Sequence, residues 1–472
     1  MEFYRKLCVI GTLLIIISGI LFPKGAGCIT IKEEEEMSRE FMKVVMEHFQ
    51  LIKDPIITNY VNEVGQKNVA AFPPQPFTYH FYVIKEGDYN AFASPAGHIF
   101  IFSGLLEAMD SEEELAGIIS HEIAHVVCRH ISQKIERSKK IGYATLAGVA
   151  AGMILGSQGS GTAANAMTIG SIAAGQSAML AYSRDDEAQA DQIGLACLNR
   201  AGYSAKGLLL MLKKIRNRQW FGKEQIPTYL QTHPASEDRM AVIDTWIATQ
   251  EKISADVSPY QFQRAHTWLV AEYGDESAAL RKFESDVKDH PEDPLAHYGY
   301  GLILARIGNR QDAVEQLKIA LEKKAFDPYI LKDIGRIYFL DGRYQEALDT
   351  FSAAGSIAAY DPEGLFYLGR TQTEMGRVKE AADTLERLIT INPEYSQAYY
   401  FLGEAYGKLN RLDYAHYYLG IYYKKTANFK NATFHLQKAL ETMSDADKRL
   451  KIEQMLNEVR KEIAESRKRA TP

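Results

Sequence analysis

Two histidines and a glutamate lie close together in the run His121-Glu122-Ile123-Ala124-His125. On a helix, histidines four residues apart project from one face, where both imidazoles can reach a single cation. Zinc suits this pair because it accepts imidazole and carboxylate, and a catalytic zinc site uses three protein ligands plus water. Taken alone, the same spacing also fits two surface histidines, so the prediction of a metal site needs a third ligand.

A second motif, Ser183-Arg184-Asp185-Asp186-Glu187-Ala188-Gln189-Ala190-Asp191, offers that ligand. Glu187 and Asp191 are four residues apart and share one face of the next expected helix. In one division of labour, Glu187 completes the metal site and Asp191 accepts the free N–H of a liganding histidine. The alternative is a pair of solvated acids on a surface helix.

Several patterns predict the elements that position these motifs. Ser111 and Glu114 have capping-box spacing, which predicts a helix that starts about three turns before the first motif. Residues 77–84 and 96–102 alternate like strands and predict a small sheet. Apolar residues between 41 and 69 recur at helical intervals.

The last third of the chain repeats with a period of thirty-four residues. This is the tetratricopeptide period, which predicts a solenoid of paired helices. Glycine in the first helix lets its partner approach closely, a later glycine supplies the turn, and alanine fits the crossing. The repeating positions are Gly301, Gly335, Gly369 and Gly403; Ala313, Ala347, Ala381 and Ala415; and Gly308, Gly342 and Gly376, with Asn410 in the fourth copy.

The array extends beyond these four copies. Gly274 and Ala279 form a degenerate earlier copy, and Gly420 and Ala432 return after half a period. The second helix of the fourth copy is therefore expected to double as a first helix. The charged tail that follows reads as a solvated capping helix.

The length, the net charge and the N-terminal residues limit the domain count, the partners and the location of the protein. A chain of 472 residues exceeds the ~250–300 at which single cores stop growing, so we expect two folded units. A formal charge of -6 gives no electrostatic reason to expect a nucleic-acid partner. Arg5 and Lys6 precede an apolar run from Leu7 to Phe22, which is typical of a cleaved secretory signal; an uncleaved anchor is the weaker reading.

Two further segments raise the question of membrane contact. Cys28 follows Ala26-Gly27 as in a bacterial lipobox, although Gly25 stands where Leu is usual. The cysteine is either lipidated or incidental. Residues 141–183 carry no Asp, Glu, Lys or Arg and predict a helical hairpin. That hairpin is either a pair of helices packed through small residues or one that touches the membrane.

Four motifs together resemble the peptidase family that contains the CAAX prenyl proteases and the HtpX heat-shock protease. They are HEIAH, SRDDEAQAD, NAFASPAGHIFIFSGLL and THPASEDR, within residues 41–245. The secreted members with a tetratricopeptide tail are the most similar. The resemblance, the repeats and the N-terminal apolar run together predict a mostly α chain. Its parts are a signal peptide or lipoprotein leader at 1–28, a gluzincin-type α+β metalloprotease domain with a small sheet at 29–250 that includes the uncharged hairpin at 141–183, an α-solenoid of tetratricopeptide repeats at 258–445, and a charged C-terminal helix or tail at 446–472.

The resemblance also implies roles for individual residues. One Zn²⁺ is bound by His121, His125 and Glu187, while Glu122 is the general base and Asp191 lies behind the ligands.

Two residues of the last motif carry open alternatives. His233 matches a histidine near the metal, where it stabilises the transition state, caps the zinc as a fourth ligand, or only orders a Pro-containing turn. Arg239 contacts either a substrate carbonyl or a structural carboxylate.

The resemblance implies a periplasmic bacterial zinc endopeptidase, with 141–183 and Cys28 as the two candidate points of membrane association. It would cleave unfolded or misassembled outer-membrane proteins, with the repeats docking substrate or the outer-membrane assembly machinery. The alternative is a repeat-based chaperone or adaptor in which proteolysis is secondary.

Overall fold

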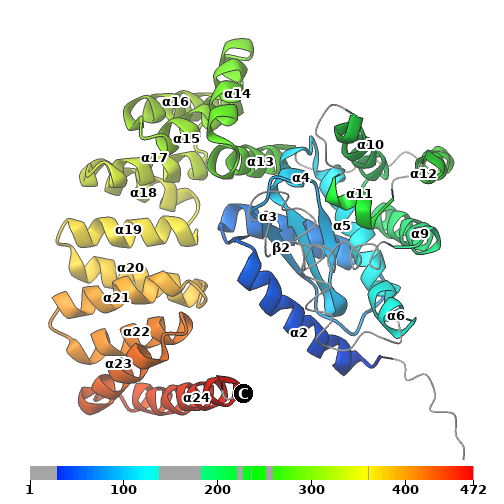
Figure 1. Cartoon of the computed structure of the whole chain (residues 1–472). Helices are drawn as coiled ribbons and strands as arrows, with labels where there is room; N and C mark the ends of the chain where they lie inside the picture. Colours follow the sequence, from blue (N-terminus) through cyan, green and yellow to red (C-terminus); the bar gives the residue numbers. More distant parts are fainter. Residues whose placement is uncertain are drawn as a thin grey trace, which may run out of the picture. The chain divides into compact units, whose positions relative to one another are not determined.

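The computed structural model describes residues 29–137, 182–220, 227–234, 237–250, 259–359 and 361–470. The expected signal peptide, Cys28 and nearly all of the uncharged segment 141–183 lie outside the described residues. The chain divides into two compact units, Met1–Asp275 and Glu276–Pro472 (Figure 1). Within the described ranges, no helix combines the length and the apolar character needed to cross a membrane.

The first unit contains the predicted small sheet, which has four strands in the order β1-β2-β4-β3. β2 and β4 pair in parallel, and β1 and β3 add antiparallel at the two edges. The sequence predicted only two strands, because β1 and β3 are too short for an alternating pattern to register. The elements are α2 (Ile31–His48), β1 (Leu51–Ile52), α3 (Pro55–Val69), β2 (His80–Ile84), β3 (Ala91–Ala93), the 3-10 turn η1 (Pro95–Gly97) and β4 (His98–Phe102).

Helices α2 and α3 pack against this sheet. On α2, the Phe41 ring lies 5.9 Å from the rings of both Phe92 and Phe100, in a cluster of buried apolar residues. On α3, a Cβ at Gly65 would lie 2.4 Å from the Phe81 ring, so only glycine allows this close approach to β2. The sheet packs beside α5 (Glu112–Val127), the second helix after β4.

This helix, α5, is buried almost throughout. Ser111 Oγ accepts from the backbone N–H of Glu114 at 3.4 Å, as the predicted start requires. The Glu114 carboxylate, however, accepts from Asp110 N and Lys214 Nζ. The predicted capping box is therefore half formed, and its acid instead links α5 to a later helix.

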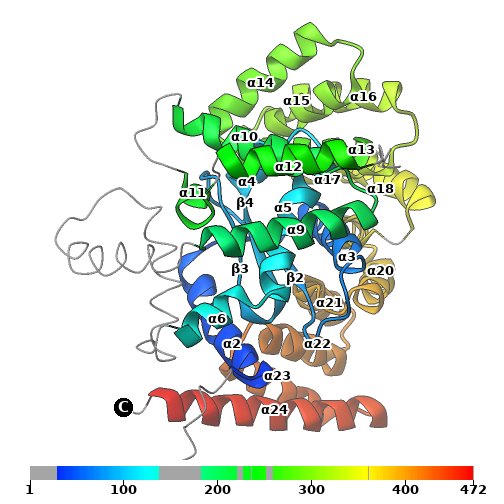
Figure 2. The same ribbon diagram turned by 90° about the vertical axis from the view of Figure 1, so that its right-hand side faces the viewer.

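Helices α9 and α10 pack directly on α5, and Figure 2 shows α9 lying across it. Two glycines allow close contact: a Cβ at Gly117 would lie 2.6 Å from Leu208 N, and one at Gly207 would lie 2.1 Å from Glu113 O. The other helices that the structure describes in the first unit are α4 (Ser103–Glu107), α6 (His130–Arg137), α9 (Arg184–Arg200), α10 (Lys206–Trp220), α11 (Thr228–Thr232), α12 (Glu237–Thr249) and α13 (Pro259–Tyr273).

Helix α13 belongs to the first unit, whereas the repeat array was expected to begin at residue 258. Trp268 on α13 is buried, and its Nε1–H donates to Asp54 Oδ2 at 2.8 Å, at the start of α3. The second unit begins with α14.

The second unit is an array of helix pairs, which confirms the predicted tetratricopeptide solenoid. A Cβ on Gly301, Gly335, Gly369 or Gly403 would approach Leu317, Phe351, Leu385 or Leu419 to 2.7–2.9 Å. The turn positions Gly308, Gly342, Gly376 and Asn410 all have positive φ. The helices are α14 (Glu276–Asp289), α15 (Pro294–Arg306), α16 (Arg310–Lys323), α17 (Pro328–Leu340), α18 (Tyr344–Ile357), α19 (Pro362–Glu374), α20 (Val378–Ile391), α21 (Ser396–Lys408), α22 (Leu412–Lys425), α23 (Phe429–Thr442) and α24 (Ala446–Ala470).

The end of the array keeps the same packing rule. A Cβ at Gly420 would lie 2.6 Å from Leu436, so α22 packs on α21 and also receives α23. The charged tail forms α24, but it is not wholly solvated, because Ile452, Leu456 and Val459 are buried. This apolar stripe covers the end of the solenoid.

Candidate metal centre

Helix α5 carries the first motif into the interior of the unit. His121, Glu122 and His125 have exposed fractions of 0%, 0% and 1%. Helix α9 crosses at this level, where Ser120 Oγ donates to the carbonyl of Gly194 at 2.8 Å. The crossing places the acids of the second motif beside the histidines of the first.

Four side chains converge at this point: His121, His125, Glu187 and His233 each offer one ligand atom, and these atoms lie within 4.8 Å of one another. The two Nε2 atoms of His121 and His125 are 3.0 Å apart. Glu187 Oε1 is 3.4 Å from His125 Nε2 and 2.9 Å from His233 Nδ1. Imidazole nitrogens with a carboxylate are a donor set that zinc prefers.

Glu122 has an unusual environment. Both its carboxylate oxygens are buried, and neither has a hydrogen-bond partner in the described part of the chain. The nearest cation-forming group is His233, whose Nε2 lies 3.7 Å from Oε1. Burial raises the pKa of Glu122, against the opposing influence of the neighbouring histidines. A buried acid without donors is costly, so its place beside the ligand cluster fits a group that brings its own protons, such as a metal-bound water.

Asp191 and Arg239 support the cluster from behind. Asp191 Oδ1 is 3.0 Å from His121 Nδ1, on the opposite side of the ring from Nε2. Arg239 donates to the same carboxylate through Nε at 2.6 Å and Nη2 at 2.9 Å, and also pairs with Glu187. Although burial acts to raise the pKa of Asp191, Arg239 and His121 hold it below its usual value. Of the two alternatives for Arg239, the structural carboxylate is the one in contact.

His233 follows α11 and is completely buried. Its backbone N–H donates to Tyr229 O at 2.7 Å, and its ring stacks on the Tyr229 ring at 4.6 Å. The imidazole therefore points into the ligand cluster, with Nδ1 toward Glu187 and Nε2 toward Glu122. The reading in which it only orders a turn does not account for these contacts.

Sequence reasoning missed His130, Gln189 and Tyr182. His130 Nδ1 lies 2.9 Å from His125 Nδ1, and its Nε2 lies 2.9 Å from Gln189 Oε1. The Tyr182 ring lies 3.9 Å from the His125 ring. Helical spacing gives no sign of His130, because α5 ends before it and Arg129 has a positive φ of 54°.

Comparison with known proteins agrees with both halves of the chain. Residues 54–247 match peptidase family M48, and tetratricopeptide repeat families match residues 274–328, 304–362 and 338–400. The chain therefore carries a peptidase family M48 domain followed by tetratricopeptide repeats. The resemblance predicted from the motifs is confirmed.

Curated relatives of the same class include bacterial and mitochondrial proteins. The putative beta-barrel assembly-enhancing protease of Vibrio cholerae is 29% identical over 58% of this chain and 57% of its own length. The beta-barrel assembly-enhancing protease of Escherichia coli is 30% identical over 45% and 43%. The mitochondrial metalloendopeptidase OMA1 of Schizosaccharomyces pombe is 26% identical over 46% and 62%. The chain thus spans about half the length of the curated relatives it matches.

Proposed function

We propose that this protein is a zinc-dependent endopeptidase whose one Zn²⁺ is held by His121, His125 and Glu187. The observation that carries the proposal is the convergence of these ligand atoms, with His233, within 4.8 Å beside the buried carboxylate of Glu122. A structural zinc site would need no acid without hydrogen-bond donors at its edge. A catalytic site has such an acid as its base.

Zinc, when bound, supplies a Lewis acid that polarises a peptide carbonyl and lowers the pKa of water. Glu122 then takes a proton and returns it to the leaving amine. Its burial suits both transfers. Burial raises the pKa of Glu122 toward the pH at which the enzyme works, where the carboxyl can both gain and lose a proton. Asp191 orients His121 by accepting its Nδ1–H, and Arg239 keeps Asp191 ionised.

His233 is proposed to cap the metal as a fourth ligand in the arrangement described. Its Nδ1 lies 2.9 Å from Glu187 Oε1, within the ligand cluster and not at its rim. His233→Ala should then raise basal cleavage of an unfolded protein, expressed per bound zinc. A fall in activity would contradict capping and favour transition-state stabilisation.

The edge of the sheet and the relatives support a proposal for the substrate class. β3 is an edge strand that packs beside α5, so an extended chain could pair with it and reach the site. Two of the relatives are named for β-barrel assembly. We infer that the protein works in the bacterial periplasm on unfolded or misassembled outer-membrane proteins, with the repeats docking substrate or assembly partners.

Metal removal tests the proposed activity. Dialysis against a chelator should abolish cleavage of a reduced, unfolded protein, and one equivalent of Zn²⁺ should restore it. Cleavage that persists after the metal is removed would contradict the proposal.

Crosslinking of the Glu122→Gln form in its own cell, followed by identification of the bound proteins, tests the substrate class. Recovery of no envelope protein would contradict the periplasmic role. If Glu122→Gln preserves the full cellular effect, the chaperone or adaptor function replaces proteolysis.

A further inference from the structure

We propose that His130 and Gln189 form a hydrogen-bonded relay that positions His125 as a metal ligand. The inference rests on the proposed metal site and adds residues outside its ligand set. His130 is 2% exposed and begins α6, while Gln189 lies on α9 between Glu187 and Asp191. Two contacts of 2.9 Å connect His125 Nδ1 to His130 Nδ1 and His130 Nε2 to Gln189 Oε1.

The two contacts allow one consistent assignment of protons when a metal is bound. His125 turns Nε2 toward His121 and Glu187, so a metal would take the Nε2 lone pair. Its proton then resides on Nδ1 and is donated to His130 Nδ1. His130 must therefore carry its own proton on Nε2, which it donates to Gln189 Oε1, an atom that can only accept. Every donor in the relay of His125, His130 and Gln189 then meets an acceptor.

Asp186 is the other acceptor near His130, but its geometry excludes it. Its Oδ1 lies 3.9 Å from His130 Nε2, beyond hydrogen-bond distance. The same carboxylate already accepts from the backbone N–H of Ser183 at 3.0 Å, which caps α9. The relay therefore ends on the neutral amide of Gln189.

The two ligand histidines are thus supported in different ways. His121 donates its outer N–H to the carboxylate of Asp191, whereas His125 donates to a neutral imidazole. The charges explain the difference: with a divalent cation bound, Glu122, Glu187 and Asp191 together with Arg239 already balance it. A further ionised acid behind His125 would leave the buried site with net negative charge, which is costly in a poorly solvated interior.

The backbone is arranged to hold His130 in place. Arg129 has a φ of 54°, a conformation unfavourable for a residue with a Cβ, and this turn carries the chain from α5 back toward His125. Arg129 Nε donates to the buried carboxylate of Glu34 on α2 at 2.6 Å, which anchors the turn. On its other side the His125 ring meets Tyr182.

Variants at His130 test the relay through zinc affinity, measured on the full chain by competition with a chromogenic chelator. His130→Phe removes the acceptor and should weaken zinc binding by ~10–100-fold, the usual effect of losing such a partner. His130→Asn places an amide oxygen where Nδ1 was and should restore affinity to within a few-fold of the wild type. The visible spectrum of the Co²⁺-substituted protein should change for Phe and be retained for Asn.

Gln189→Leu is the second variant, and it guards against a folding defect because the Gln189 side chain is exposed. It should weaken zinc binding less than His130→Phe, with an unchanged melting temperature of the metal-free protein. Wild-type affinity in both His130→Phe and Gln189→Leu would overturn the relay while leaving the metal site intact. Absence of zinc binding by the wild type would instead overturn the proposed function.

Discussion

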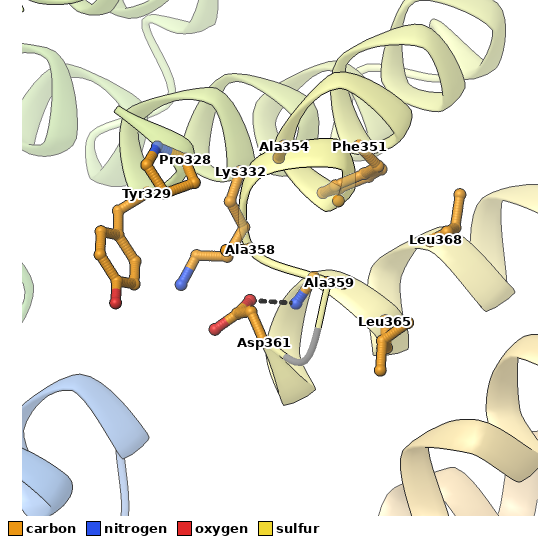
Figure 3. Close-up of a pocket in the computed structure, with 12 residues that line it drawn as sticks. Pro328, Tyr329, Lys332, Phe351, Ala354, Ala358, Ala359, Asp361, Leu365 and Leu368 are labelled. Carbon is orange, nitrogen blue, oxygen red and sulfur yellow. Dashed lines mark hydrogen bonds between the residues drawn. The ribbon is translucent and has the colours of Figure 1, made fainter. Parts of the chain in front are cut away.

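Both units of the chain bury charged side chains, but they do so in different ways. In the repeat array, Lys332 and Asp333 on α17 are 2% and 0% exposed. Lys332 Nζ donates to Glu363, and Asp333 Oδ2 accepts from Tyr298 Oη at 2.8 Å. Figure 3 shows Lys332 with Tyr329 at the wall of a pocket between α17, α18 and α19.

The two regions differ in how many hydrogen-bond and ion-pair partners each buried charged group has. In the array, the buried cation of α17 meets an acid on α19, in the following helix pair, and the phenol of Tyr298 on α15 donates to the buried acid of α17. In the candidate metal centre, four ligand atoms face a common point, and Glu122 has no donor among the described residues. Buried charge alone therefore does not mark a functional site. A functional site is indicated when several buried ligand atoms converge on one point with too few hydrogen-bond donors to satisfy them.

Loss of a direct metal ligand should lower zinc affinity more than any other substitution. A small loss would contradict the distinction between the metal centre and the buried charges of the array. Glu187→Gln removes the carboxylate that contacts both His125 and His233. Because loss of an outer partner costs about 10–100-fold in metal affinity, loss of a ligand should cost more, with cleavage reduced at least as much. Zinc content after gel filtration and the rate of cleavage of an unfolded protein measure this. Retained zinc would remove Glu187 from the ligand set.

A smaller loss is expected behind His121. Asp191→Asn keeps an oxygen acceptor for the Nδ1–H but removes the charge that pairs with Arg239. Zinc affinity should fall by about 10-fold, at the lower end of the effect of such partners. Chelator competition gives the value, and Asp185→Asn, an exposed acid on the same helix, is the matched control. Equal affinities in the two variants would contradict the role of Asp191.

The buried acid of the array should respond to pH instead of metal. Burial raises the pKa of Asp333 to about 7, above its value in the unfolded chain. Stability from its protonated form is fully present below about pH 4 and is lost as the pH rises through 7. At pH 8 Asp333→Asn, which keeps an acceptor for Tyr298, should stabilise the array by about 1–3 kcal/mol.

Thermal unfolding of the wild type and of Asp333→Asn at pH 5.5 and pH 8 checks this prediction. The difference between the two proteins should grow with pH. A variant that is less stable at pH 8 would show that its charged neighbours outweigh burial.

Glycine substitutions probe the packing between the helices of one repeat. A Cβ at Gly369 would lie 2.8 Å from Leu385 Cγ, so Gly369→Ala should destabilise the array by ~1–3 kcal/mol through overpacking. Gly355, on α18, has open space around its Cβ position, and Gly355→Ala should stabilise by ~0.5–1 kcal/mol. Urea denaturation distinguishes the two. The same sign for both would contradict the steric explanation of the repeat.

Periodicity decided what the sequence could predict. His121 with His125, and Glu187 with Asp191, are separated by one helical turn, so their shared faces follow from spacing alone. The repeat array could be predicted equally well from the sequence, because each repeating glycine recurs at the same interval as the large side chain that packs against it. His130 escaped prediction because a left-handed residue, Arg129, interrupts the helix before it.

Other features depended on contacts that no local pattern records. β1 has two residues and β3 three, so neither shows alternation. The place of α13 depends on Trp268 reaching Asp54, far away in the sequence. The pairing of Arg239 with Asp191 likewise depends on how α12 and α9 meet.

The central claim is that the cluster on α5 and α9 is a catalytic zinc site with Glu122 as its base. The most direct test measures zinc content and cleavage of an unfolded protein for the wild type and Glu122→Gln side by side. We expect one zinc per chain in both proteins, with cleavage by the wild type alone. Cleavage by Glu122→Gln at the wild-type rate, or a wild type that binds no zinc, would contradict the claim.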